Sequence, residues 1–358
     1  MVQEMRIGIN GLGRIGKLNL KELELLDAED SSSGSENRVV VAAINDVLST
    51  DEIVASFNHR DQTHGYIGLK AGKISEDAIS LSGKKIAVFH EADPARIPWG
   101  DYGIAVVADC TGRATERAAA EKHLIGGANY VVVSAPGKGF DKTLAMAVNH
   151  YEFNPLEHHI ISNASCTTKA VAVPLKALID YGIEIHSVIM DTTHAATNSE
   201  RTLQVGTKYG VLNEIITAKT GAAIATSELI PSLEGRMGGY ALRVPTLDGS
   251  FANISFVAGG DSLEQSAINY ILEEASCNPK TLGRLDYNTQ PEVSSTDIIG
   301  NTASSVIVAS QTRSNQLPFY IQGDSSKPVV HAAICSGYDN ELGPSRDLAM
   351  LVRYVALK

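Results

Sequence analysis

The chain has 358 residues, 44% of them hydrophobic, and a formal net charge of −11, as expected of a globular protein with room for two domains of ~100–200 residues each. The acidic charge argues against a nucleic-acid or anionic-membrane partner, because the phosphates would be repelled. The N-terminal MVQEMRIGIN lacks the apolar core of a signal peptide, and no apolar run reaches the ~20 residues of a membrane helix, so we expect a cytoplasmic protein without a membrane partner.

Short apolar strands and helices alternate over the first part of the chain. Strands are predicted at 6–10, 39–46, 105–112 and 130–136. Residues 13–26 form a predicted helix with a leucine-rich face, and another helix is predicted between the last two strands. Near-continuous apolar runs are typical of strands buried on both faces. The pattern therefore predicts an α/β fold with a Rossmann-type doubly wound parallel sheet. Segment 27–38 has one apolar residue, Ala28, and is predicted to be an exposed insertion.

The second part of the chain has longer β-rich stretches. They follow a predicted helix at 166–181 and lie at 183–194, 240–260, 303–313 and 328–338. A helix is predicted at 262–275, and an amphipathic helix at 344–358. This order predicts an α+β catalytic domain with a mainly antiparallel sheet. We expect the first domain at 1–164 and the second at 165–340, with the C-terminal helix 341–358 packing back on the first.

A glycine-rich turn follows the first predicted strand. Gly11, Gly13 and Gly16 form a GxGxxG pattern between that strand and a helix, the context in which this pattern holds the pyrophosphate of a dinucleotide. The second strand ends at Asp46, where an acid takes the adenine-ribose hydroxyls and repels a 2′-phosphate. Residues 47–50 include no Lys or Arg to hold that phosphate. The pattern predicts NAD rather than NADP as the cofactor.

The chain has four cysteines, none at CxxC or zinc-ligand spacing: Cys110, Cys166, Cys277 and Cys335. All are expected to be free thiols, and three of them small core residues. Cys166 differs, because it stands between a predicted strand and a predicted helix, where the helix dipole lowers a thiol pKa. His194, at the end of a predicted strand, is the candidate base for the thiol proton.

Around Cys166 the sequence SNASCTT (162–168) is specific, and a strand ending in TTH follows 28 residues later. With these motifs the chain resembles the phosphorylating glyceraldehyde-3-phosphate dehydrogenases, from about Arg6 to Arg353. Further motifs that carry the resemblance are INGLGRIG (9–16), AAIND (42–46), VVVSAP (131–136), TGAA (220–223), LRVPT (242–246) and YDNELG (338–343).

The resemblance implies a role for each site residue. Cys166 would be the nucleophile and His194 its activator. The residues implied to contact NAD, besides the three glycines, are Arg14, Ile15, Asp46, Thr111, Ser134 and Asn340. Those implied to bind the attacking inorganic phosphate are Ser165, Thr167, Thr220 and Gly221. Those implied to bind the phosphate of the substrate are Thr197 and Arg243. A homotetramer without a bound metal is also implied.

The implied reaction is the glycolytic, NAD-dependent oxidation of glyceraldehyde 3-phosphate to 1,3-bisphosphoglycerate, through a cysteine thioester that phosphate attacks. Erythrose-4-phosphate dehydrogenase, which hydrolyses the thioester, shares the fold, the cysteine and the histidine and is the alternative. Less favoured are a semialdehyde dehydrogenase, a type that usually prefers NADPH, and a catalytically idle binding protein of the same fold. Arg243 paired with a surface acid and Asn340 as a helix N-cap are the structural alternatives for those two residues.

Several positions depart from the family pattern. Lys169 and Ala170 replace the Asn and Cys that usually follow SNASCTT, and the lysine would lower the thiol pKa, bind an anion or point to solvent. Ser199 stands where an acid is usual, Tyr209 where an arginine is usual, and Pro344 where a tyrosine is usual. Because the loop around Tyr209 usually shapes the phosphate site, these departures leave triose and tetrose phosphates both open as substrates.

Overall fold

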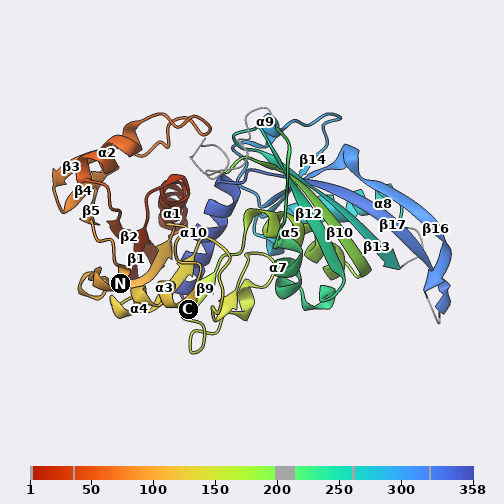
Figure 1. The fold of residues 1–358 in the computed structure, drawn as a ribbon, viewed down its shortest axis with the longest axis horizontal. Coiled ribbons are helices and arrows are strands. Elements are labelled where there is room, and N and C mark those ends of the chain that lie inside the picture. The colour runs from red at the N-terminus through yellow and green to blue at the C-terminus, as the bar shows by residue number, and fades with distance from the viewer. Residues whose placement is uncertain (1–2, 35–36, 198–213, 260–262, 322–323) are drawn as a thin grey trace. The chain divides into compact units, whose positions relative to one another are not determined.

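The computed structural model describes residues 3–34, 37–197, 214–259, 263–321 and 324–358 (Figure 1). The chain divides into two compact units. One consists of Met1–Ala145, His150–Ser165 and Pro344–Lys358, and the other of Met146–Asn149 and Cys166–Gly343. Within the described ranges, we find no helix that combines the length and the apolar character needed to cross a membrane.

The first unit contains a nine-stranded sheet in the order β3-β4-β5-β2-β1-β6-β7-β9-β8. Neighbours pair in parallel from β5 to β8, whereas β3 and β4 add an antiparallel edge. This order confirms the predicted doubly wound sheet. The strands are β1 (Gln3–Asn10), β2 (Asn37–Asn45), β3 (Ala71–Ser75), β4 (Ala78–Leu81), β5 (Lys84–Phe89), β6 (Ile104–Asp109), β7 (Tyr130–Val133), β8 (Lys142–Thr143) and β9 (Ile160–Ser162).

The helices of this unit follow the apolar periodicity except where the chain turns tightly. They are α1 (Arg14–Ser33), α2 (Thr50–Asn58), α3 (Arg117–Ala120), α4 (Lys122–Ile125) and α10 (Leu342–Ala356), with the 3₁₀ turns η1 (Pro94–Arg96), η2 (Gly100–Tyr102) and η3 (His150–Glu152). The single helix predicted between β6 and β7 is thus two short ones, interrupted at Glu121.

The prediction of an exposed insertion at 27–38 is wrong in its secondary structure, because α1 continues to Ser33, although most of the described residues of this segment are exposed. Asp27 and Asp30 lie buried on this extension. Arg38 Nη2 lies 2.6 Å from Asp27 Oδ2, and Lys84 Nζ 2.8 Å from the same atom. Arg353 of α10 donates to Asp30 through Nε at 2.7 Å, so α1 and α10 are joined side by side (Figure 1). Ion pairs rather than apolar residues pack this segment, and a hydropathy pattern cannot show that.

We expect Asp27→Asn to destabilise the protein by ~1–3 kcal/mol at pH 7, the cost of losing hydrogen bonds to charged groups. Burial by itself raises the pKa of Asp27, but the hydrogen bonds from Arg38 and Lys84 outweigh it and the pKa lies below its ordinary value. A carboxylate with a lowered pKa stabilises the fold above its unfolded pKa, and this contribution disappears as the pH falls through the folded pKa. Urea unfolding of both proteins between pH 7 and 3 measures the difference, which should shrink toward the acid end.

The matched control for this experiment is Asp51→Asn. Asp51 pairs with Lys73 at 2.7 Å, but its side chain is 74% exposed, so its loss should cost no more than ~1 kcal/mol. A difference between wild type and Asp27→Asn that stays constant with pH would contradict the account of the Asp27 pair.

The second unit contains an eight-stranded sheet in the order β11-β12-β10-β13-β17-β15-β14, with β16 pairing β17. Most neighbours are antiparallel, but β10–β12 and β14–β15 are parallel. The predicted α+β unit is therefore confirmed. The strands are β10 (Glu184–Ala195), β11 (Ile216–Ala218), β12 (Met237–Val244), β13 (Ser250–Gly259), β14 (Leu285–Asn288), β15 (Ser305–Val308), β16 (Arg313–Ile321) and β17 (Asp324–Tyr338).

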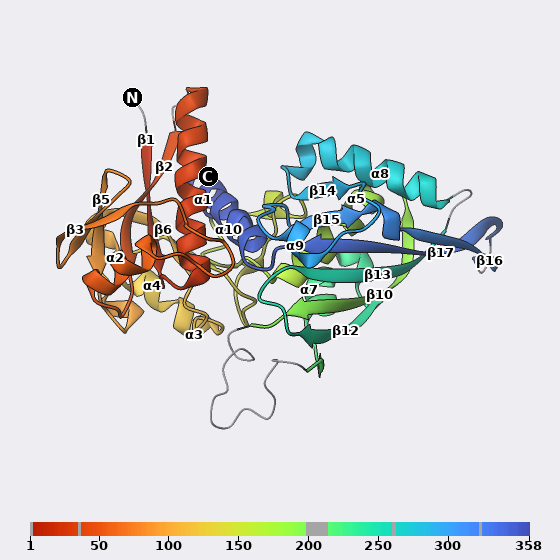
Figure 2. The same ribbon diagram turned by 90° about the horizontal axis from the view of Figure 1, so that it is seen from above.

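Helices pack against this sheet. They are α5 (Cys166–Asp180), α7 (Ala222–Leu229), α8 (Gln265–Cys277) and α9 (Ser295–Ile298), with the 3₁₀ turns η4 (Pro231–Leu233), η5 (Pro279–Thr281) and η6 (Ala309–Gln311). Figure 2 shows α8 running beside α5, and α5 also packs on β15 and β17. The β-rich stretch predicted at 240–260 divides into β12 and β13. Gly249 makes the turn with φ 78°, where a side chain would lie 2.4 Å from the Ser295 carbonyl oxygen.

Candidate active site

The reactive cysteine predicted from the sequence is the first residue of α5. The chain reaches it through Ala164, a non-glycine residue in the left-handed region at φ 55°, whose backbone N–H donates to Ser162 Oγ at 3.0 Å. Such strained residues persist where the surrounding structure holds them, and they are frequent at functional sites. The turn starts the helix at Cys166, so that the positive end of the helix dipole faces the thiol.

His194 lies beside this thiol. It is the penultimate residue of β10, and its Nε2 is 3.4 Å from Cys166 Sγ. Nδ1 of the same ring lies 2.7 Å from the Ala195 carbonyl oxygen. Because a carbonyl only accepts, Nδ1 carries a proton and donates it there. This leaves Nε2 to exchange a proton with the sulfur, as a base needs.

The charged forms of Cys166 and His194 stabilise each other. Burial by itself raises the pKa of Cys166, but the charge of His194 and its hydrogen bond outweigh burial, and the thiol pKa lies below its ordinary value. Burial lowers the pKa of His194, yet the Cys166 thiolate raises it above its ordinary value. Both directions favour a thiolate–imidazolium pair, which is the nucleophilic form of a cysteine.

The structure describes two of the residues that depart from the family pattern, Lys169 and Pro344. Lys169 is 1% exposed, so the alternative that it points to solvent is wrong, and its charge contributes to the lowered pKa of Cys166. The carbonyl oxygen of Pro344 accepts a hydrogen bond from Asn163 Nδ2 at 3.3 Å. Ser199 and Tyr209 lie outside the described residues.

The remaining cysteines differ from Cys166. Burial raises the pKa of Cys335 to about 11, and burial also raises the pKa of the Cys110 thiol. Cys277 is exposed at the end of α8, so the expectation that all three are core residues is wrong for this one. Position in the fold, rather than residue type, thus separates Cys166 from the others.

The residues predicted to bind phosphates belong to the second unit, except Ser165, which ends a segment of the first. Arg243 of β12 is the register partner of His194, and its positive charge acts to lower the pKa of that histidine. Thr220 and Gly221 immediately precede α7, which packs on α5, and Thr220 Oγ1 accepts from Ala222 N at 3.1 Å. Thr167 is buried in the first turn of α5. Ser165 and Thr197 are half-buried next to the ends of α5 and β10.

In the first unit, the glycine turn has the shape that a dinucleotide needs. Gly11 adopts φ 89°, and a side chain on Gly16 would lie 1.9 Å from the Gly11 carbonyl oxygen. A side chain on Gly13 would meet nothing within 4 Å, so the space in front of it is open. The turn is close-packed where helix meets strand and open where a pyrophosphate would approach, and it therefore fits NAD.

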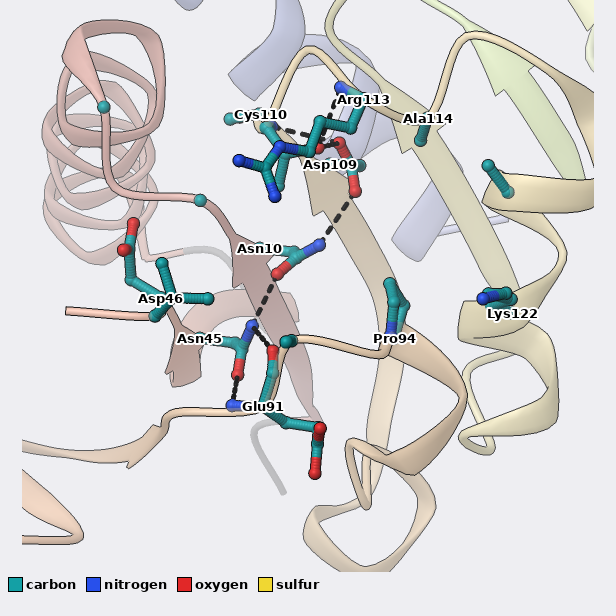
Figure 3. Close-up of a pocket in the computed structure, with 16 residues that line it drawn as sticks. Asn10, Asn45, Asp46, Glu91, Pro94, Asp109, Cys110, Arg113, Ala114 and Lys122 are labelled. Atoms are coloured by element: carbon teal, nitrogen blue, oxygen red, sulfur yellow. Dashed lines mark hydrogen bonds between the residues drawn. The ribbon is translucent and has the colours of Figure 1, made fainter.

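A pocket of about 300 Å³ lies at the carboxyl ends of the strands (Figure 3). Gly11, Gly13, Asp46 and Thr111 line it. The other predicted contacts of this unit lie outside the lining. Ile15 and Gly16 belong to α1, Ser134 follows β7, and Arg14 donates to Thr63 Oγ1 at 2.7 Å.

Asp46 is fixed by two backbone groups. Its Oδ2 accepts from Leu12 N at 2.7 Å and its Oδ1 from Leu48 N at 3.1 Å. Both oxygens are therefore held in place, one of them by the glycine turn itself. A carboxylate at this point favours ribose hydroxyls and repels a 2′-phosphate, in agreement with NAD as the cofactor.

We expect Asp46→Asn to weaken NAD binding by about tenfold, or ~1.4 kcal/mol, and to reduce the preference for NAD over NADP. Two N–H donors face the two oxygens of Asp46, and an amide offers only one acceptor. Titration of the protein with each cofactor measures the effect. Glu91→Gln, which removes another carboxylate of the same pocket, is the control, and an unchanged NAD-to-NADP ratio in Asp46→Asn would overturn this account.

Part of the pocket wall is a buried polar network that the sequence analysis did not identify (Figure 3). Asn45 Nδ2 donates to Asn10 Oδ1 at 2.7 Å, and Asn10 Nδ2 donates to Asp109 Oδ2 at 2.9 Å. These three residues end β2, β1 and β6. The sequence could have identified these residues, because each is the polar residue that ends an apolar run. Neighbouring parallel strands end at the same edge of a sheet, so such residues are expected to lie close together.

Two aromatic residues complete the network. Trp99 Nε1 donates to His123 Nδ1 at 3.0 Å, so the other ring nitrogen of His123 carries the proton and donates to Asp109 Oδ2, also at 3.0 Å. Asp109 Oδ1 accepts from the backbone N and the Oγ1 of Thr111, at 3.0 and 2.7 Å. The network therefore holds Thr111 at the pocket wall.

A second group, of which the sequence analysis identified only Thr167 and Asn340, surrounds Tyr338 at the end of β17. The Tyr338 hydroxyl lies 3.0 Å from Thr167 Oγ1 and 2.7 Å from Thr192 Oγ1. Ser250 Oγ donates to Asn340 Oδ1 at 2.8 Å. These contacts were not predicted, because they join four separate segments that only the fold brings together.

The N-cap alternative for Asn340 is wrong. Asp339 Oδ1 accepts from the backbone N–H groups of Glu341 and Leu342, at 2.9 and 2.7 Å, so Asp339 caps the start of α10. The Asn340 side chain bonds Ser250 instead.

Comparison with known proteins gives a consistent result. The family model described as the NAD-binding domain of glyceraldehyde 3-phosphate dehydrogenase matches residues 5–117, and the model of its C-terminal domain matches residues 165–324. The glyceraldehyde-3-phosphate dehydrogenase of Streptomyces coelicolor is 36% identical over 98% of each chain. Glyceraldehyde-3-phosphate dehydrogenase 1 of Bacillus cereus is 35% identical, and the Geobacillus stearothermophilus enzyme 34% identical, each over 99% of both chains.

Proposed function

The chain belongs to the glyceraldehyde-3-phosphate dehydrogenase family, and on that premise we propose that Cys166 is its nucleophile and His194 its catalytic base. The protein is an NAD-dependent enzyme that converts glyceraldehyde 3-phosphate to 1,3-bisphosphoglycerate. The observation that carries the residue assignment is the 3.4 Å contact between Cys166 Sγ and His194 Nε2, with each partner shifting the pKa of the other toward the ion pair.

The chemistry of the pair follows from these charges. The Cys166 thiolate adds to the aldehyde carbon and forms a C–S bond, while the carbonyl oxygen takes the proton from His194 Nε2. His194 takes this proton back as the carbon gives up its hydride, and a thioester remains on Cys166. When bound, NAD supplies the hydride acceptor. Inorganic phosphate then attacks the thioester carbon, the C–S bond breaks, and the sulfur leaves as the thiolate.

The phosphate sites are assigned to residues around this pair. Thr197 and Arg243 bind the phosphate of the substrate, and the attacking phosphate is bound by Ser165, Thr167, Thr220 and Gly221. Two observations support this: Arg243 stands beside His194 in register, and α7 begins directly after Gly221, where a helix N-terminus favours an anion.

The cofactor is assigned to the glycine turn and the strand ends around it. The assigned residues are Gly11, Gly13, Arg14, Ile15, Gly16, Asp46, Thr111, Ser134 and Asn340. The open space before Gly13 and the fixed Asp46 carboxylate support the part nearest the adenine ribose. We propose that residues 1–164 form the NAD-binding domain, on which the C-terminal helix 341–358 packs, and that residues 165–340 form the catalytic domain.

One assay tests the function directly. The protein is incubated with NAD and glyceraldehyde 3-phosphate, with and without phosphate, while the absorbance of the reduced cofactor is followed. Turnover that requires phosphate or arsenate supports the proposal. Turnover of erythrose 4-phosphate without phosphate would support the alternative dehydrogenase instead, and turnover of neither substrate would indicate an idle protein of this fold.

We also assign the enzyme to the cytoplasm, where a free reactive thiol persists, and to a homotetramer. On the sheet face opposite α5, Ile189 and Tyr240 are each 51% exposed and belong to neighbouring strands, β10 and β12. Exposed apolar side chains on a sheet face favour contact with another copy. Light scattering of the protein as it elutes from a size-exclusion column measures the mass of the assembly, and the mass of a monomer would refute the assignment to a homotetramer.

A further inference from the structure

We propose that Ser250 is a positioning residue for the cofactor, because it holds the side-chain amide of Asn340 in one orientation for the nicotinamide. This rests on the proposed function, in which Asn340 is assigned to NAD. Asn340 belongs to the unit that contains Cys166, and the nicotinamide is the part of NAD that accepts the hydride from the carbon held by Cys166. The Asn340 amide is therefore assigned to the carboxamide group of the nicotinamide.

The Ser250 hydroxyl is fixed by the neighbouring strand. Ser250 is the first residue of β13 and is fully buried. Its Oγ accepts from the backbone N–H of Ala195, the last residue of β10, at 3.0 Å, and lies 2.8 Å from Asn340 Oδ1. The Tyr338 hydroxyl also hydrogen-bonds Ser250, so three groups converge on one oxygen atom. The position of this atom is set by a backbone group, which cannot rotate away as a side chain can.

Asn340 is held at its backbone and at its side chain by two residues of one turn. Its backbone N–H donates to Asp248 Oδ1 at 3.0 Å, and the same oxygen accepts from Gly249 N at 2.8 Å. Its side chain meets the Ser250 hydroxyl. Among the residues that the structure describes, Ser250 is the one hydrogen-bond partner of the Asn340 amide. The opposite end of the amide is therefore left for a ligand.

The consequence for the cofactor is a contact that is ordered in advance. The last torsion of an asparagine side chain is broad and roughly two-fold, so an amide without a partner would be ordered only when the nicotinamide binds, at a cost to affinity. The bond to Ser250 orders this amide beforehand. The residue that fixes Ser250 also serves the base, because the Ala195 carbonyl oxygen accepts from His194 Nδ1 at 2.7 Å. Ser250 therefore joins the group that holds the nicotinamide to the segment that orients the base.

The test compares the binding of NAD with that of ADP-ribose, the fragment of NAD that lacks the nicotinamide. We expect Ser250→Ala to raise the dissociation constant of NAD by about fivefold, as the loss of one neutral hydrogen bond would. The dissociation constant of ADP-ribose should stay within about twofold of wild type. Ser250→Cys, which fills nearly the same space but is only a weak donor, should change the ratio of the two constants in the same direction. Titration calorimetry measures both constants, and a folding defect would weaken the binding of both ligands together.

A matched control and a double-mutant cycle complete the design. Ser305→Ala removes another fully buried hydroxyl of the same sheet, whose Oγ lies 2.8 Å from Ser336 Oγ, and should leave both dissociation constants unchanged. In an Asn340→Ala background, Ser250→Ala should have no further effect on the ratio of the two constants, because both changes act through one amide. An unchanged ratio in Ser250→Ala, together with a raised ratio in Asn340→Ala, would overturn the role of Ser250 alone. If Asn340→Ala itself leaves the ratio unchanged, the assignment of Asn340 to NAD in the proposed function fails, and the role of Ser250 fails with it.

Discussion

Replacing Cys166 by serine is expected to lower kcat by on the order of 10⁵–10⁶-fold, the scale seen when an enzyme loses its nucleophile. The serine hydroxyl does not ionise beside His194 as the thiol does, and it is a poor nucleophile without that ionisation. NAD binding should stay within about twofold of wild type, because the pocket lined by Gly11, Asp46 and Thr111 is unchanged. Steady-state assays and a cofactor titration of the same preparation provide both values.

Cys335→Ser is the control for this substitution. Cys335 lies in the same unit, and burial raises its thiol pKa to about 11, so it does not supply a thiolate at neutral pH. Its loss should leave turnover within about twofold of wild type. If Cys166→Ser keeps most of its activity, or if Cys335→Ser loses it, the nucleophile has been assigned to the wrong residue.

His194→Asn is expected to lower kcat by ~10²–10⁴-fold, the usual contribution of general acid–base catalysis. The variant should also react more slowly with iodoacetamide at neutral pH. In wild type, burial raises the pKa of Cys166 but the charge of His194 more than offsets it. Without the imidazolium, burial remains, and the pH at which Cys166 becomes reactive moves upward. The rate of alkylation as a function of pH measures this shift.

The matched control lies on the same strand. His186 is half-buried on β10, and its Nδ1 lies 4.0 Å from Glu184 Oε1. It stands eight positions before His194 on this strand. His186→Asn should keep both the turnover and the pH profile of alkylation. An alkylation profile that moves to lower pH in His194→Asn, or does not move at all, would contradict the ion pair.

The sequence by itself determined those features that depend on neighbouring residues. The apolar runs that became β1, β2, β6 and β7 predicted a parallel sheet, because strands buried on both faces carry few polar residues. The glycine turn and Asp46 predicted the cofactor, since a tight turn and a helix start are local properties. The step from strand to helix at Cys166 was readable for the same reason.

Only the tertiary structure decided the features that depend on register and packing. Segment 27–33 has a single apolar residue, Ala28, yet Asp27 and Asp30 are buried there and pair with cations from β2, from β5 and from α10. The hydrogen bond between Thr167 and Tyr338 joins residues 171 positions apart in the sequence, and the one between Asn10 and Asp109 joins residues 99 positions apart. Such contacts exist because the sheets bring strand ends together, and no residue carries a local sign of a partner so distant in sequence.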